Sequence, residues 1–202
     1  RDQSVESPPA ASDEPDFYDE AAEKPVLYLY PEEEQSVTVR LDYSGTLGST
    51  SPGYNEGWTV TASPDGTLTD ETGRQYPCLS WEGTSDISYD FRRGFVVPGE
   101  ETRAFLEETL PYLGLNDRES ADFIACWLPR MQENDYNLIA FQGRAWTDGT
   151  KLDITPAPDS LIRVFMAWKP VDGDYEIPEQ KLPRGVRDGF TVVECGGFEL
   201  PS

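Results

Sequence analysis

The stretch 98–131, PGEETRAFLEETLPYLGLNDRESADFIACWLPRM, decides the fold class, because its apolar residues recur with helical spacing. In its first half, Glu100 and Glu101 are well placed to interact with the positive end of a helix dipole. Gly114 is a typical stop signal. The residues of one apolar face are Phe105, Leu106, Leu110 and Leu113. We therefore predict a helix that begins near Pro98 and ends at Gly114.

The second half of this stretch predicts another helix directly after the first. Asn116 and Glu119 have the spacing of a capping box, in which each side chain bonds to the other residue's backbone N–H. Pro129 is expected to end or kink this helix, because proline lacks the amide hydrogen that a helix interior needs. The apolar face that becomes buried comprises Phe123, Ile124, Trp127, Leu128 and Met131.

Both flanks of the helical stretch carry strand patterns. The run 26–30 (VLYLY) is continuously apolar and residues 37–41 alternate, so we expect these two strands to form a hairpin. A second hairpin is expected from 58–62 and 67–69, which a Pro-Asp-Gly turn connects. The other predicted strands are 76–81, 87–91, 94–97, 136–141, 144–147, 152–154, 161–168 and 191–193, with loops at 44–53 and 169–189.

This order of strands, two adjacent helices and more strands lacks the βαβ alternation of parallel folds. It predicts an α+β fold, with a mainly antiparallel β-sheet and two adjacent helices inserted mid-chain. Residues 1–24 differ, because they hold eight acidic and two basic residues among Pro, Ser and Ala. Such a segment cannot bury enough apolar surface to order itself, so we predict an acidic tether at 1–24 and a single domain at 25–202.

The composition excludes several functions. The chain has 202 residues, a formal net charge of -22 and no histidine, so no Ser-His-Asp or Cys-His centre and no imidazole metal site can form. Nucleic-acid binding needs clustered Lys and Arg, and the 38 acidic against 16 basic residues argue against it. No apolar run is long enough to span a membrane. The acidity favours a neutral or cationic partner.

The cysteines and the acidic segments indicate no bound cofactor or metal. Cys78, Cys126 and Cys195 are an odd number, so at most one disulfide can form, and we expect small buried hydrophobic side chains. The acidic turn at 172–174 and the segment 86–90 do not have the spacing of an EF-hand calcium loop. We therefore predict no metal site and no cofactor.

Residues 24–32, KPVLYLYPE, resemble the KPVIYLYPE opening of a group of uncharacterised proteins of Gram-positive bacteria. Further similar segments are WLPRM at 127–131, YNLIAFQ at 136–142 and PEQKLP at 178–183. The resemblance covers almost all of the predicted domain, with one departure, since Cys195 stands where that group has an aromatic residue. It implies an exported or lipid-anchored protein at the cell surface. The tether would then be a stalk that connects an upstream lipid anchor to the domain. It implies no catalytic residue.

An enzyme without histidine could still use paired carboxylates, as glycosidases do. The candidates are Glu82 beside Trp81, Glu179 after a proline, and Glu194 at a strand end before two glycines. A carboxylate next to a tryptophan can act as a general acid when its surroundings favour the protonated form. With 38 acidic residues in the chain, most glutamates accept bonds from Arg or from backbone.

Binding of a sugar or another ligand is the more economical interpretation, because it needs only an exposed ring with polar groups around it. The candidate rings are Trp81, Trp146 and Trp168, and Asn137 and Gln142 bracket a predicted strand where their amides could contact a polar ligand. We therefore predict a secreted or cell-surface protein that binds a glycan or another protein. The alternatives are a carboxylate-dependent hydrolase acting on extracellular polysaccharide and an interaction domain with no small ligand.

Overall fold

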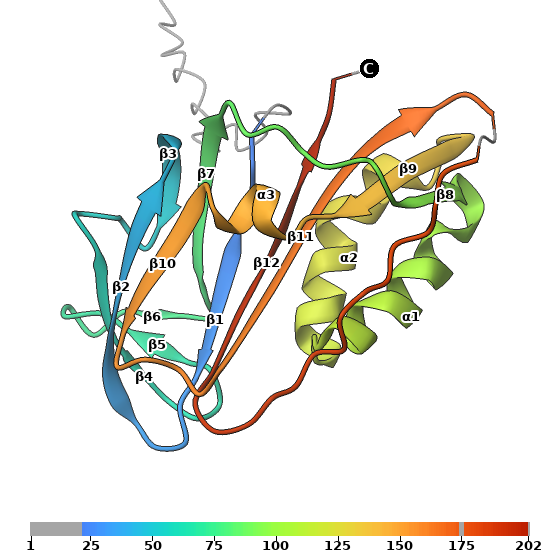
Figure 1. Cartoon of the computed structure of the whole chain (residues 1–202). Helices are drawn as coiled ribbons and strands as arrows, with labels where there is room; N and C mark the ends of the chain where they lie inside the picture. The colour runs from blue at the N-terminus through green and yellow to red at the C-terminus, as the bar shows by residue number, and fades with distance from the viewer. Residues whose placement is uncertain (1–21, 174–175, 202) are drawn as a thin grey trace, which may run out of the picture.

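The computed structural model describes residues 22–173 and 176–201. The predicted tether therefore lies outside the described residues, except for its last three. The described chain is a β-rich α+β structure in three layers, and Figure 1 shows a smaller sheet, a larger sheet and a helical layer in that order. The predicted α+β fold class and the two adjacent helices are confirmed.

The central layer is a seven-stranded sheet with the strand order β3-β7-β1-β12-β11-β9-β8. All of its neighbouring pairs are antiparallel except β11 and β12, which run parallel. Its strands are β1 (Val26–Tyr30), β3 (Gly45–Ser51), β7 (Leu79–Ser85), β8 (Phe95–Pro98), β9 (Tyr136–Phe141), β11 (Ser160–Val171) and β12 (Thr191–Glu199).

The outer layer is a five-stranded sheet with the order β10-β2-β4-β5-β6. Its strands are β2 (Gln35–Tyr43), β4 (Trp58–Ala62), β5 (Leu68–Thr69), β6 (Gln75–Tyr76) and β10 (Thr150–Thr155). The predicted hairpin of β4 with β5 is confirmed, but the predicted hairpin of β1 with β2 is wrong, because the two strands lie in different sheets. The continuously apolar β1 pairs on both edges inside the central sheet, whereas the alternating β2 covers that sheet from outside.

The helical layer follows the sequence signals closely. A short 3₁₀ turn at Gly99–Glu101 leads into α1 (Thr102–Leu113), and Gly114 ends this helix with a φ of 110°, which glycine adopts without strain. Asn116 caps α2 (Asp117–Met131) and forms the predicted capping box with Glu119. Pro129 lies in the last turn of α2, which ends two residues later.

The central sheet separates two apolar cores, because successive side chains of a strand point to opposite faces. Leu27 and Leu29 of β1 enter the sheet-side core between the two sheets, and Tyr28 enters the helix-side core under α1 and α2. Trp127 of α2 is buried in the helix-side core, as predicted. The rings of Trp81 and Trp146 fill the sheet-side core, so aromatic packing contributes strongly to both.

Three local predictions are wrong. Residues 45–51 form the edge strand β3 although their Gly, Ser and Thr content predicts a loop, because pairing with β7 overrides the weak local preference. Residues 87–91 form no strand, since the Gln142 side chain bonds both backbone groups of Asp90 in place of a neighbouring strand. Residues Arg144–Thr147 form the short helix α3, which turns Trp146 into the sheet-side core.

The last residues of the predicted tether are packed against the domain. Glu23 is buried and exchanges backbone hydrogen bonds with Gly83 of β7. Its carboxylate accepts hydrogen bonds from the hydroxyls of Tyr43, Ser85 and Tyr89. Burial, together with the nearby Glu23 carboxylate, raises the pKa of Tyr89. The described residues at the end of the predicted tether therefore contact the domain that follows them.

The return segment 176–190 connects β11 with the parallel strand β12 and crosses the helical layer on the way. Gly94 next to β8 donates a backbone hydrogen bond to Pro178, and Gly185 donates one to Tyr112 of α1. The Arg187 guanidinium bonds the fully buried Glu119 carboxylate at 2.6 Å. This crossing places the segment beside α1 and the β8 edge of the central sheet.

Candidate functional site

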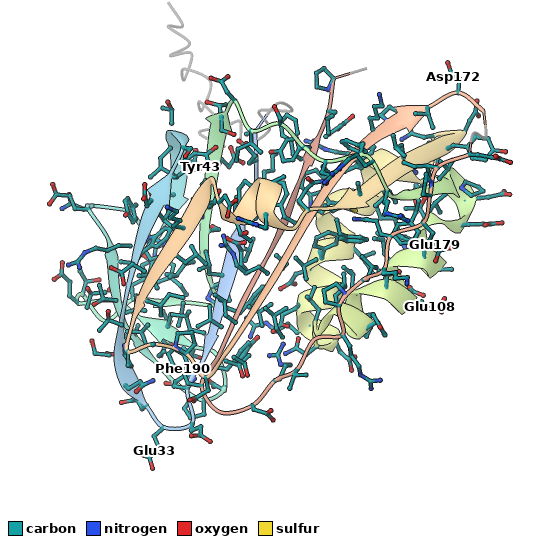
Figure 2. All side chains as sticks on the ribbon, in the orientation of Figure 1. Glu33, Tyr43, Glu108, Asp172, Glu179 and Phe190 are labelled. Atoms are coloured by element: carbon teal, nitrogen blue, oxygen red, sulfur yellow. The ribbon has the colours of Figure 1, made fainter. Side chains whose placement is uncertain are left out.

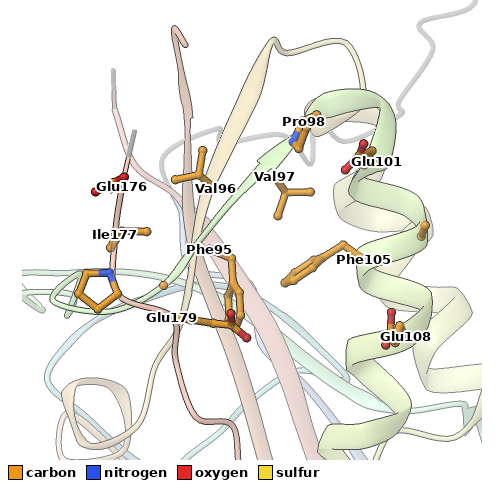
Figure 3. A pocket seen from close by; sticks show the side chains of 13 residues that line it. Phe95, Val96, Val97, Pro98, Glu101, Phe105, Glu108, Glu176, Ile177 and Glu179 are labelled. Atoms are coloured by element: carbon orange, nitrogen blue, oxygen red, sulfur yellow. The ribbon is translucent and has the colours of Figure 1, made fainter. Parts of the chain in front are cut away.

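A groove opens at the β8 edge of the central sheet, between α1 and the start of the return segment. Its volume is about 1060 Å³. Figure 3 shows Glu101, directly before α1, and Glu108 on α1 facing this space from one side, and Glu176 and Ile177 from the other. The groove is thus built by three parts of the chain that are distant in the sequence.

The base of the groove is apolar. Phe95, Val96 and Val97 of β8 line it together with Phe105 of α1 and Ile177 of the return segment. The rings of Phe95 and Phe105 have centroids 5.1 Å apart. Of these five side chains only Val97 is buried, so the others present apolar surface to an occupant.

The rim of the groove is acidic. Its four carboxylates belong to Glu101, Glu108, Glu176 and Glu179, all of which are exposed. Within residues 22–173 and 176–201, none of them forms an ion pair with Lys or Arg. The groove therefore combines an apolar base with uncompensated negative charge.

The groove continues toward Leu182 as a second hollow of about 860 Å³. Phe95, Phe105, Glu108 and Glu179 line both parts, and Lys181 lines the continuation. The whole trough therefore follows α1 over about two turns and suits an extended ligand.

The wall at 178–181 is fixed to the sheet by side-chain and backbone bonds. The Gln180 amide accepts a hydrogen bond from the Phe141 N–H and donates one to the Phe141 carbonyl, both at 2.8 Å. Gly94 donates to the Pro178 carbonyl at 2.9 Å. This wall therefore has a defined position relative to β8 and β9.

The three candidate glutamates lie at three different places. Glu179 lines the groove, whereas Glu194 is fully buried in the sheet sandwich, where Arg163 pairs with it at 3.0 Å. Glu82 is on the opposite face of β7 from the buried ring of Trp81, and Lys24 lies 3.8 Å from its carboxylate. No two of these three glutamates share a cleft, so they do not form the carboxylate pair that a glycosidase needs.

The candidate tryptophans are core residues. Trp81, Trp146 and Trp168 are at most 1% exposed, so the expected exposed ring platform is not formed by them. The chain has few aliphatic residues, and these large rings fill the cores instead. The structure does bring two candidates together, because the Trp146 indole donates to the Glu194 carboxylate at 2.8 Å.

The two candidate amides are also buried, and they hold the chain together. Asn137 donates to the Met131 carbonyl and to the Thr102 hydroxyl, so it ties β9 to both helices. Gln142 accepts from the Asp90 N–H at 2.8 Å and donates to its carbonyl at 3.1 Å. Neither amide is exposed to a ligand.

Among the residues that line the groove, Glu179 is the one that the sequence singles out, as a candidate catalytic carboxylate. Glu101 just before α1 and Phe105 and Glu108 on α1 line the same side of the groove, and this pattern of an aromatic residue between two acids could have indicated a functional surface. Phe105 was instead assigned to the buried face of the predicted helix. Gln180 gave no signal, because its partner Phe141 is distant in the sequence.

The cysteines and the acidic groups show no other assembled centre. Cys78, Cys126 and Cys195 are free thiols, but the expected burial holds only for Cys195, since Cys126 is exposed and Cys78 is half-buried. Burial raises the pKa of Cys195 well above its usual value. Among the described residues, no three Cys, Asp or Glu side chains gather where they could bind a metal ion. The described part of the chain also contains no helix with the length and apolar character needed to cross a membrane.

Comparison with known proteins gives a partial match. No family model and no solved structure matches the chain. The chain is similar to a protein of Butyrivibrio fibrisolvens described as "Uncharacterized protein in bglA 3'region". The two are 48% identical over 63 residues, which make up 30% of this chain and 65% of that protein. The match therefore spans less than two thirds of the relative.

Proposed function

We propose that this protein is a binding domain whose groove at the β8 edge holds an extended, positively charged polypeptide segment with apolar side chains. The observation that carries the proposal is the combination of an apolar base with four exposed glutamates that have no cationic partner in the described structure. The volume of about 1060 Å³ is at the upper end of the range for ligand sites.

Charge and shape favour a peptide over a neutral glycan. Sugar platforms use exposed aromatic faces, and the tryptophans are buried. The groove instead offers Phe95, Phe105 and Ile177 between carboxylates, which suits alternating apolar and basic side chains. Complementary charge would also speed association and reject anionic competitors.

We also propose that this binding domain is located outside the cell. The resemblance to secreted and lipoprotein-type proteins and the acidic composition of residues 1–24 support display outside the cell. The net charge of -22 is compatible with a cationic partner, since a strongly acidic surface repels anionic neighbours.

Fluorescence anisotropy with three labelled eight-residue peptides tests the binding proposal. The peptides alternate valine with lysine, with serine or with glutamate. The lysine peptide should bind saturably and at least about tenfold more tightly than the serine peptide, because several charge contacts add to the apolar ones. Equal affinity for all three peptides, or preference for the glutamate peptide, would contradict the proposal.

A matched pair of variants locates the site. The double substitution Glu108→Gln and Glu179→Gln should weaken lysine-peptide binding about tenfold. The control is Glu32→Gln with Glu33→Gln, which removes the same charge from an exposed loop, and Figure 2 shows Glu33 at the opposite end of the molecule. The control should bind as the unmodified protein does, and an equal loss in both variants would place the ligand elsewhere.

A further inference from the structure

A separate hollow, distinct from the groove and its continuation toward Leu182, lies on the other side of the wall formed by residues 178–181. It has a volume of about 770 Å³ and is lined by residues from three segments around 90–93, 141–145 and 178–181. Pro178 lines both this hollow and the acidic groove. The two spaces are therefore back to back, with one short stretch of chain between them.

The charge of this hollow is opposite to that of the protein as a whole. Arg92, Arg93, Arg144 and Lys181 line it, which are four of the 16 basic residues in a chain of net charge -22. Asp90 is the acidic residue in the lining. Such a local concentration of cations in an acidic protein creates an anion-attracting region that the net charge conceals.

The acidic residues nearby compensate this charge only in part. Asp90 pairs with Arg92 at 2.6 Å, and this contact lowers the pKa of the Asp90 carboxyl to about 2. Asp148 lies 3.5 Å from Arg144. Lys181 has no ion pair in the described part of the chain, and Arg93 bonds only the Glu179 carbonyl, at 3.5 Å. Two of the four cations thus remain without a carboxylate partner.

The backbone that carries these cations is held in place from two sides. The buried Gln142 amide accepts a hydrogen bond from the Asp90 N–H and donates one to the Asp90 carbonyl. The Gln180 amide binds the N–H and carbonyl of Phe141 in the same way, and we call each such pair of bonds a glutamine clasp. These two clasps connect all three segments of the lining. A Cβ atom added at Gly143 would meet no atom within 4 Å, so the space above this residue is open.

We propose that this hollow binds an anionic group, a carboxylate or a phosphate, of a ligand that is separate from the occupant of the acidic groove. Arginine presents a planar fork of N–H donors that matches both oxyanions in a bidentate manner, and lysine adds a point charge. Because the hydrogen bonds of Gln142 and Gln180 fix the backbone of the lining segments, only the exposed arginine and lysine side chains need to become ordered when an oxyanion enters. The inference does not depend on the occupant of the peptide groove, since no groove carboxylate takes part, although Lys181 lines both the hollow and the continuation of the groove.

NMR titration of the ¹⁵N-labelled protein tests the proposal with inorganic phosphate, citrate and chloride. Phosphate or citrate should shift the side-chain Nε–Hε signals of Arg92, Arg93 and Arg144 in a saturable manner, while equal ionic strength of chloride should not. The oxyanion with the lower dissociation constant identifies the group of the natural ligand as phosphate or carboxylate. Absence of saturable shifts with both oxyanions, or equal shifts at every arginine in the protein, would overturn the proposal.

Two matched double variants separate the site from general charge effects. The substitutions Arg144→Ala and Lys181→Ala should weaken oxyanion binding at least about fivefold. The control, Arg40→Ala with Lys151→Ala, removes one exposed arginine and one exposed lysine from the outer sheet and should bind like the unmodified protein. Circular dichroism verifies folding of both variants, and an equal loss in both would exclude the hollow as the site.

Discussion

The acidic groove and the basic hollow share one wall but differ in almost every physical property. The groove has an apolar base of β8 and α1 side chains with four glutamates around it, and the hollow has three cations on loops, a fourth at the start of α3, and one aspartate. The wall at 178–181 separates these opposite charges. A net charge of -22 therefore says little about any one surface, because the charges are distributed unevenly over the molecule.

The two spaces should also differ in how they bind. Apolar contact with Phe95 and Phe105 contributes free energy that salt does not screen, whereas exposed ion pairs weaken as ionic strength rises. An inorganic oxyanion has no apolar surface to place against Phe141, Ala145 or Pro178 of the hollow, so its binding there depends on charge. If the two sites are distinct but share residues 178–181, substitutions in the wall should affect both ligands and substitutions outside it only one.

The largest effect on stability and binding is expected when the wall at 178–181 loses the two hydrogen bonds that connect Gln180 to the Phe141 backbone. Gln180→Ala removes both hydrogen bonds to the Phe141 backbone, and Phe141 is only 7% exposed. Leaving those backbone groups unpaired should lower the free energy of unfolding by about 2–3 kcal/mol. It should also lower the affinity for both the lysine peptide and the oxyanion. Urea denaturation and the two titrations measure these changes.

The control for this variant is Gln75→Ala, at an exposed position of β6 in the outer sheet. It should change neither stability nor binding by more than the error of the measurements. If Gln180→Ala weakens one ligand and leaves the other unchanged, the wall is not a common support of the two sites.

A smaller effect should separate the sites from each other. Phe105→Ala removes a half-buried ring that packs against Phe95 at 5.1 Å and forms the base of the groove. Peptide affinity should fall about tenfold, with a loss of about 2 kcal/mol of stability, while oxyanion binding stays constant. The matched control is Val186→Ala, which truncates a side chain that is 62% exposed on the same return segment.

This prediction fails if Phe105→Ala weakens the oxyanion as much as the peptide. In that event, the substitution would act through general loosening of α1. A retained peptide affinity would instead show that the groove binds through charge alone, and the apolar base would have no part in recognition.

Raising the salt concentration should change the two affinities by different factors. Between about 0.05 and 0.5 M NaCl, the oxyanion should lose more affinity than the lysine peptide, because the Debye length falls from about 14 to about 4 Å and only the peptide keeps its apolar contacts. Anisotropy and NMR titrations at four salt concentrations measure both slopes. Equal slopes would remove the distinction between an apolar and a purely charged site.

The sequence predicted elements whose signals are local. The stop at Gly114 and the capping box of Asn116 with Glu119 are encoded within a few residues, and the structure confirms both helices. The pairing partner of β1 was not predictable in this way, because β12 lies far along the chain. The edge strand β3 was missed for the same reason, since its Gly- and Ser-rich sequence forms a strand only beside β7.

Of the residues in the candidate site, only Glu179 could be named from the sequence as a site candidate. Its other walls come from β8 and α1, and nothing in the PEQK sequence indicates that the return segment crosses those elements. The tryptophans were the strongest compositional signal for a ligand platform, yet packing uses them in the cores. The basic hollow was concealed by the overall acidity, because Arg92, Arg144 and Lys181 converge only in the folded chain.

The smallest expected effect is a coupling between the two sites through the wall that they share. An oxyanion in the basic hollow and a cationic peptide in the groove carry opposite charges, so each should stabilise the other across residues 178–181. Screening limits this to about a twofold gain in affinity at 0.15 M salt. Peptide titrations with and without saturating phosphate measure the gain, against sodium chloride of equal ionic strength. Linkage requires the peptide to increase phosphate affinity by the same factor, so unequal factors would mean that the two ligands do not bind the two sites proposed here.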